Sequence, residues 1–136
     1  AKFLRALGYY NLVTLFENIP LITEPQSPDA RVPAAPPAAT YAQIEQDLVD
    51  AADALPETYG AGMAARPTRW AALAMLGRVR LQMAGVLDQQ GKWAEAATAL
   101  GQVVASGQYA LLDDYAANFR ESSDFDNIES LFEVST

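Results

Sequence analysis

Apolar side chains recur at three- and four-residue steps in two neighbouring stretches of the chain, residues 70–83 and 93–104. That spacing places them on one face of an α-helix, whereas a half-buried strand would show alternation at every second residue. Both stretches contain small residues, Gly77, Ala96 and Ala97, which allow two helix backbones to approach closely. The pattern predicts a tetratricopeptide-type helical hairpin, an architecture that presents binding surfaces and rarely carries out chemistry.

Extended along the whole chain, the same pattern predicts an all-α architecture. We expect helices at residues 1–16, 40–55, 68–87 and 93–105, and a short one at 113–121. Residues 23–39 carry five of the eight prolines, so we expect a long, semi-rigid surface loop without regular structure. Weak alternation over residues 128–134 predicts a short C-terminal strand. The fold class is therefore antiparallel helical hairpins with a long proline-rich loop and one strand.

The helix ends are predicted from local capping signals. Thr40 is expected to cap the second helix, with Gln43 three residues later completing a capping box. Thr68 is expected to cap the third helix, and residues 89–91 to form the turn that follows it. Gly107 is well placed to end the fourth helix in the left-handed conformation.

Composition and charge narrow the possible functions. At 136 residues the chain fits one domain, and 51% apolar residues exclude a disordered chain. The net charge of −8 argues against nucleic acid and against an anionic membrane surface. There is no cysteine and no histidine, which removes thiol chemistry and the commonest general base and metal ligand. We therefore expect no metal, no cofactor and no catalytic residue.

Several segments together resemble the SusD/RagB-like proteins, the nutrient-binding outer-membrane lipoproteins of polysaccharide-utilisation systems in Bacteroidota. The signature helix and exit loop of that family resemble Phe3-Leu4-Arg5-Ala6-Leu7, Tyr9-Tyr10-Asn11-Leu12-Val13 and Phe16-Glu17-Asn18-Ile19-Pro20-Leu21. Later family segments resemble Tyr41-x-x-Ile44-x-x-Asp47-Leu48, Arg66-Pro67-Thr68, Trp93-x-x-Ala96, Ser106-Gly107-x-Tyr109 and Asn127-x-Glu129-Ser130-Leu131-Phe132. One departure is Glu17-Asn18-Ile19, where the family commonly has a glycine and an acidic residue before the exit proline.

The resemblance implies a non-catalytic protein that captures oligosaccharide and delivers it to a SusC-like TonB-dependent transporter. It also implies a surface-exposed lipoprotein of the outer membrane, with the helical repeats packed against the transporter. Because family members are much longer, residues 1–136 are expected to be a single helical scaffold domain excerpted from a larger protein, with the lipid anchor outside it. The resemblance maps no sugar-contacting residue onto this chain, so the ligand-binding residues and the glycan are left unknown.

The aromatic residues are the candidate sugar contacts, because the flat face of a ring matches the axial hydrogens of a pyranose. Trp70 and Trp93 both lie in register with the apolar seam, so we favour core packing over sugar platforms for them. If Trp93 is buried, Trp93→Ala is expected to destabilise the fold by about 3–5 kcal/mol. Core positions are likewise expected for Tyr9 and Tyr10, and more exposed loop positions for Tyr59 and Tyr115.

The charged residues are interpreted mainly as structural. Arg5 lies on a largely apolar helix and is expected to pair with a buried carboxylate or a helix end. We expect Glu45, Asp47 and Asp50 to lie on a solvent-facing side of their helix. The pairs Glu45/Asp50 and Glu121/Asp124 contain the two carboxylates that a glycosidase needs, but nothing in the sequence places either pair in a cleft.

The acidic C-terminal residues have a metal-binding alternative. Asp124, Asp126, Asn127 and Glu129 could supply oxygen ligands to calcium, but their spacing does not fit an EF-hand loop. A solvated acidic turn is the simpler interpretation, and Asp113–Asp114 is most simply a helix N-terminus.

The second functional hypothesis, from a different class, is an intracellular tetratricopeptide-type adaptor that binds a peptide in its concave groove.

Overall fold

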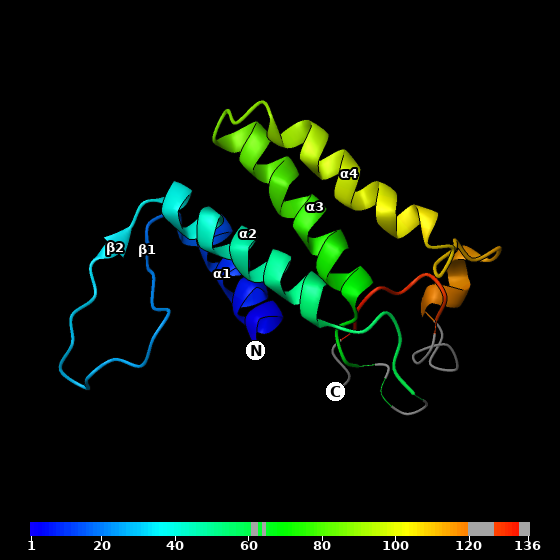
Figure 1. Ribbon diagram of the computed structural model, residues 1–136, viewed down its shortest axis with the longest axis horizontal. Helices are drawn as coiled ribbons and strands as arrows, with labels where there is room; N and C mark the ends of the chain where they lie inside the picture. Colours follow the sequence, from blue (N-terminus) through cyan, green and yellow to red (C-terminus); the bar gives the residue numbers. More distant parts are fainter. Residues whose placement is uncertain (61–62, 64, 120–126, 134–136) are drawn as a thin grey trace.

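The computed structural model describes residues 1–60, 63, 65–119 and 127–133. Its helices are α1 (Lys2–Phe16), α2 (Pro37–Ala54), α3 (Arg69–Val86), α4 (Lys92–Ala105) and a short 3₁₀ helix, η1 (Tyr115–Phe119). The α-helices pack in chain order, α1 on α2, α2 on α3 and α3 on α4, as Figure 1 shows. The predicted antiparallel hairpins are confirmed, and the helix boundaries agree with the sequence to within a few residues.

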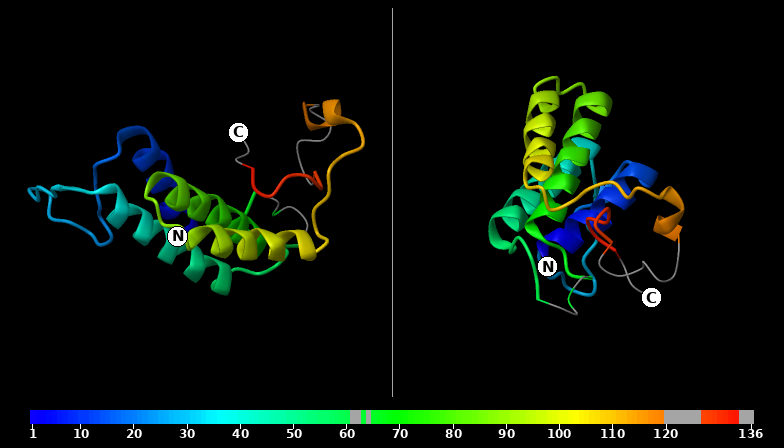
Figure 2. Two further views of the ribbon diagram at one scale, coloured as in Figure 1. Left: turned by 90° about the horizontal axis from the view of Figure 1, so that it is seen from above. Right: turned by 90° about the vertical axis from the view of Figure 1, so that its right-hand side faces the viewer.

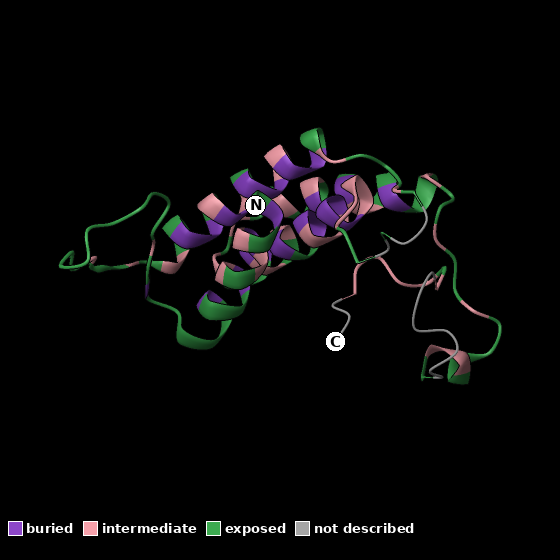
Figure 3. Ribbon diagram, turned by 90° about the horizontal axis from the view of Figure 1, so that it is seen from below, coloured by how far each residue is buried: buried purple, intermediate pink, exposed green. Residues whose placement is uncertain are grey.

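The core lies where α1, α2 and α3 face one another. Its most enclosed large side chains are Ile44 and Leu48 of α2 and Val79 of α3, all fully buried. Tyr10 and Val13 cover this core from α1. Figure 3 shows the buried positions on the facing sides of the helices. No helix in the described part of the chain is both long and apolar enough to cross a membrane.

A close approach of backbone and side chain joins α3 to α4 at Gly77. A Cβ atom placed at this glycine would lie 2.5 Å from Cγ of Leu100, well inside van der Waals contact. The missing side chain therefore leaves the space that Leu100 fills. This confirms the close packing that the small residues predict for the hairpin.

The long loop between α1 and α2 is tied together at its base. Helix α1 is followed by its C-cap Glu17, whose φ of 59° is left-handed, and the chain then enters β1 (Ile19–Pro20). Strand β1 pairs antiparallel with β2 (Ala34–Ala35), with Ile19 opposite Ala35. Figures 1 and 2 show the rest of the loop projecting away from the helices. The prediction of no regular structure over residues 23–39 is therefore wrong at β2 and at the start of α2.

Helix α2 begins three residues earlier than predicted. Pro37 occupies its first position after Pro36 as N-cap, and the predicted cap Thr40 is buried inside the helix. Proline suits this place because the first helical N–H has no partner within the helix in any case. Two other predictions are confirmed: the Thr68 hydroxyl accepts a hydrogen bond from the Ala71 N–H at 3.2 Å, and Gly107 has a φ of 65°.

The C-terminal part differs most from the sequence prediction. The short aspartate-capped helix predicted over 113–121 is present among the described residues as the 3₁₀ helix η1, where the Asp114 carboxylate accepts from the Ala116 N–H at 3.0 Å. Residues 127–133 form no strand. A turn joins the Ser130 N–H to the Asn127 carbonyl, and the Ala110 N–H donates to the Ile128 carbonyl at 3.2 Å. Glu121 and Val134 lie outside the described residues.

Candidate functional site

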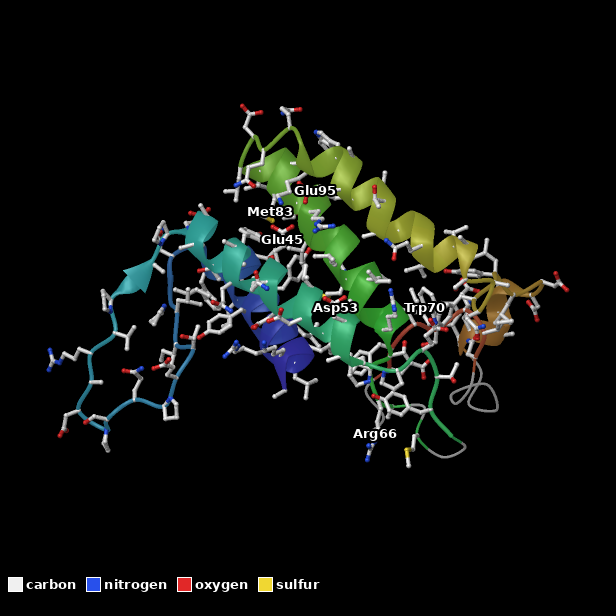
Figure 4. The ribbon with its side chains drawn as sticks, viewed as in Figure 1. Glu45, Asp53, Arg66, Trp70, Met83 and Glu95 are labelled. Atoms are coloured by element: carbon white, nitrogen blue, oxygen red, sulfur yellow. The ribbon has the colours of Figure 1, made fainter. Side chains whose placement is uncertain are left out.

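The described part of the chain has a groove of about 510 Å³ at one end of the bundle. It lies between the α2–α3 loop, the N-cap of α3, the exit of α4 and the segment 127–133. Its size is that of an ordinary small-molecule site. Figure 4 labels Arg66, one of its lining residues. The aromatic and polar lining side chains include Tyr59, Arg66, Thr68, Gln108, Tyr109 and Phe132.

Two tyrosines are fixed at the groove by bonds to the residues just before α3. The Tyr59 hydroxyl donates to the Pro67 carbonyl at 3.2 Å, and the Tyr109 hydroxyl lies 3.3 Å from the Thr68 hydroxyl. Thr68 therefore caps α3 and also holds the segment that follows α4. Tyr59, predicted to be exposed, is half-buried instead. The groove combines ring faces with amide, carboxylate and guanidinium groups, the mixture that a polyhydroxylated ligand requires.

The acidic residues beside the groove hold the backbone. The Glu129 carboxylate accepts from the Leu112 N–H at 3.0 Å and from the Asn118 amide at 2.9 Å. These bonds, that from Asn118 above all, lower the pKa of the Glu129 carboxyl below its ordinary value. Among the described residues no group of acidic side chains could hold a metal ion. Asp124 and Asp126, the other candidate calcium ligands, lie outside them.

The two tryptophans have different environments. Trp70 is half-buried against the core, with the Arg69 guanidinium 5.9 Å from the centre of its ring. Trp93 is 48% exposed, so the expectation that it packs in the core is wrong. The buried side of α4 runs through Ala96, Ala99 and Val103, and Trp93 lies at the flank of this seam.

The remaining tyrosines follow the predictions more closely. Tyr10 is buried as expected, and the Tyr9 ring is half-buried. The Tyr9 hydroxyl both accepts from the Ile22 N–H at 2.7 Å and donates to the Ile22 carbonyl at 3.0 Å, which fixes the base of the projecting loop. Tyr115 is 75% exposed, with its ring edge-to-face against Phe119.

Arg5 pairs with a buried carboxylate, as predicted, but its partner corrects another prediction. Its Nε and Nη2 atoms donate to the two oxygens of Asp47 at 2.7 and 2.6 Å. Asp47 is 1% exposed, so it does not lie on a solvent face. The bond to Asp47 raises the pKa of the Arg5 guanidinium further above its ordinary value. A third bond, from Arg5 to the Thr23 carbonyl, joins α1, α2 and the loop.

Glu45 is also paired, in a network that joins α2 to the hairpin. It accepts from Arg80 Nε at 2.7 Å, and both of its oxygens lie 2.9 Å from Lys92 Nζ. Lys92 also binds Glu95, and Figure 4 labels Glu45 on α2 and Glu95 on α4. Partial burial acts to raise the pKa of the Glu45 carboxyl, but the bonds and charges of Arg80 and Lys92 lower it below its ordinary value.

The two carboxylate pairs weighed for glycoside hydrolysis have different outcomes. Glu45 is held by its two cations, and Asp50 accepts bonds from Lys2 and Gln46, so this pair does not flank an open site. Both members of the other pair, Glu121 and Asp124, lie outside the described residues. The geometry therefore gives no support to a two-carboxylate centre at Glu45 and Asp50.

Helices stacked in chain order, with the hollow at one end, define a helical-repeat scaffold of the tetratricopeptide type. The sequence matches a family model described as "SusD-like_3: Starch-binding associating with outer membrane" over residues 1–81. The chain belongs to the SusD-like family. The resemblance predicted from its motifs is thus confirmed, together with the all-α fold class.

Three solved structures illustrate the relationship. A laminarin-binding SusD-like protein is 39% identical, and the match covers 94% of this chain and 28% of that one at a TM-score of 0.82. A SusD homolog from Bacteroides thetaiotaomicron is 33% identical over 98% of this chain and 27% of its own, with a TM-score of 0.87. A SusD-like carbohydrate-binding protein from Bacteroides fragilis is 29% identical over 96% and 25%, with a TM-score of 0.85. No curated protein sequence matches the chain.

The chain thus spans 25% to 28% of the length of these solved relatives.

Sequence reasoning missed the groove, because its lining comes from residues that are distant in the sequence. It also missed the buried place of Asp47, although a signal was present. Asp47 follows Ile44 by three residues and precedes Ala51 by four, which puts it on the buried stripe of α2.

Proposed function

We propose that the protein carrying this chain captures oligosaccharide at the outer membrane without cleaving it and passes it to a SusC-like TonB-dependent transporter. The observation that carries the proposal is membership of the SusD-like family over residues 1–81, with a related structure described as laminarin binding. We further propose that the protein is a surface-exposed lipoprotein whose anchor lies outside residues 1–136.

Within that protein the chain acts as a rigid frame. The ion pairs of Arg5 with Asp47 and of Glu45 with Arg80 and Lys92 join successive helices. Large apolar side chains remain exposed on α1, including Leu4, Leu15 and Phe16. Such surfaces support the idea that further polypeptide of the longer protein packs on α1. Family membership, and not these exposed residues, favours this proposal over an intracellular tetratricopeptide-type adaptor.

The groove is the part of this chain that best suits a sugar contact. Tyr59 and Tyr109 offer ring edges and faces, and Gln108, Asn127 and Arg66 offer hydrogen-bonding groups. We propose that it contributes one part of a ligand site, with the larger part supplied by polypeptide beyond residues 1–136. Catalysis is not part of the proposal, since the carboxylates of the Glu45/Asp50 pair are bound to cations and an amide.

The test is affinity electrophoresis of the full-length protein in native gels that contain laminarin, or another polysaccharide from a panel. Retarded migration with intact polysaccharide after incubation is the expected result. The chain of residues 1–136 alone should be retarded little or not at all. Absence of retardation by every polysaccharide would contradict glycan capture, and release of shorter sugars would contradict the non-catalytic role.

A further inference from the structure

The α3–α4 hairpin tip, residues 88–93, is a hydrogen-bonded turn. Asp88 has a left-handed φ of 54°, and the Met83 carbonyl accepts from both Leu87 and Gln89 N–H groups at the end of α3. The Lys92 N–H then donates to the Gln89 carbonyl at 2.9 Å. These backbone hydrogen bonds hold the tip in a defined turn.

Trp93 presents its indole at this tip. The side chain is 48% exposed, and its Nε1–H donates to the Gln90 amide oxygen at 3.2 Å. The Gln90 amide nitrogen in turn donates to the Asp88 carboxylate at 2.6 Å. This chain of bonds sets the orientation of an exposed ring, and it leaves the polar atom of the indole satisfied.

The neighbouring residue anchors the tip to the rest of the bundle. Lys92 Nζ lies 2.9 Å from both oxygens of Glu45 on α2 and 2.9 Å from Glu95 on α4. The ion pair of Lys92 with Glu45 ties the first turn of α4 to α2, and Trp93 is the next residue in that turn. The exposed ring is thus part of a rigid surface, and little conformational freedom is lost when a ligand binds it.

The chemistry around the ring is that of a sugar contact. The tip combines one flat apolar ring with the side chains of Asp88, Gln89 and Gln90. A carboxylate and an amide keep free lone pairs and N–H groups after the bonds described above, so they can bind hydroxyl groups. We propose that Trp93 is a platform for one neutral pyranose unit of a glycan, with its hydroxyls facing the tip side chains.

This contact is separate from the groove. The groove contains Thr68 and Tyr109, which flank the start of α3 and the end of α4, whereas the tip joins the other ends of the same two helices. A helix of 18 residues is about 27 Å long, so one glycan chain would have to extend over several sugar units to reach both places. The inference rests on the proposed function and adds a second, outlying contact to it.

The experiment compares variants of the full-length protein by affinity electrophoresis in the polysaccharide that retards the wild type. Trp93→Ala and Trp93→Leu are expected to weaken binding about tenfold, because stacking on the ring is lost. Trp93→Tyr should retain most of the binding, since it keeps an aromatic face. The matched control is Val86→Ala, which shortens an exposed apolar side chain near the tip and should leave binding unchanged.

The outcomes separate the two proposals. Wild-type binding in Trp93→Ala, with its thermal unfolding unchanged, would overturn the platform and leave the proposed function in place. Equal binding by Trp93→Leu and Trp93→Tyr, or a loss in Val86→Ala as large as that in Trp93→Ala, would show that the aromatic face does not carry the contact and would also overturn it. No retardation of the wild type by any polysaccharide of the panel would overturn both.

Discussion

Asp47 places a carboxylate where water has almost no access. Its two oxygens are satisfied by Arg5, and one of them also accepts from the Gln43 amide at 3.2 Å. A buried charge of this kind adds little stability compared with an apolar residue, but removal of one partner leaves the other without compensation. The pair therefore acts mainly by fixing how α1 lies against α2.

Asp47→Ala is accordingly expected to lower the free energy of unfolding by about 3 kcal/mol, because Arg5 loses its partner and a small cavity forms. Urea denaturation followed by circular dichroism measures the change. The matched control is Asp53→Ala, an exposed aspartate on the same helix, which should change stability by less than about 0.5 kcal/mol. Equal effects of the two substitutions would contradict the structural importance of the Arg5–Asp47 pair.

Gly77 offers a test of packing at the scale of one methyl group. Gly77→Ala brings a Cβ within 2.5 Å of Leu100 Cγ, so Leu100 has to move and the expected loss is about 1–3 kcal/mol. Gly85→Ala, on the same helix with no atom within 4 Å of the new Cβ, should gain up to about 1 kcal/mol from helix propensity. Thermal unfolding of both variants measures these changes in stability. A Gly77→Ala variant as stable as the wild type would indicate that α3 and α4 pack less closely than described.

At the scale of elements, the helices could be predicted because each has a continuous apolar stripe and most ends have a local signal. Thr68 and Gly107 behave as predicted for this reason. The start of α2 had two competing signals, the Thr40–Gln43 box and the Pro36–Pro37 pair. Proline at the first position prevailed, and the Gln43 side chain binds Asp47 instead of completing a box.

Long-range contacts explain what the sequence could not show. The place of Glu45 depends on Arg80 and Lys92, which lie on other helices and are distant in the chain. Trp93 has the same apolar period as the buried residues of α4, so periodicity alone assigns it to the core, although it lies at the edge of the seam. The groove brings Tyr59, Tyr109 and Phe132 together only after the helices have packed.

The Glu45 network gives stability a dependence on pH. The pKa of the Glu45 carboxyl lies below its ordinary value of 4.5 in the folded chain, so its ion pairs contribute fully above that value. This contribution is lost as the pH falls through the ordinary value and then through the lowered one. Glu45→Gln should therefore be less stable than the wild type by about 1–2 kcal/mol near neutral pH, and the difference should shrink as the pH falls below the ordinary value.

Urea denaturation of the wild type and Glu45→Gln over this pH range measures the difference directly. Asp53→Asn serves as the control, because Asp53 is exposed on the same helix and forms no ion pair with any described residue. A gap between wild type and Glu45→Gln that stays constant with pH would contradict the role of the charged network.

At the scale of the whole molecule, the helical stack has a well-filled interior, but large apolar side chains also lie on its outer surface. On α1, Leu15 is 74% and Phe16 66% exposed, and on α4 Val104 is 80% exposed. Terminal helices of repeat proteins that fold alone carry polar outer faces, since water is their only neighbour. The outer face of α1 therefore resembles an interior surface of a longer stack.

From this surface we expect residues 1–136, prepared alone, to self-associate as concentration rises, because paired α1 faces remove apolar area from water. Light scattering coupled to size-exclusion chromatography measures the mass. Leu15→Gln combined with Phe16→Ser should shift the chain towards the monomer, whereas Leu111→Gln, at an exposed leucine outside the helices, should not. A monomer at every concentration would show that the exposed side chains of α1 are tolerated in water. In that case the support they give to a longer stack would fall, while the fold and the family assignment would stand on their own evidence.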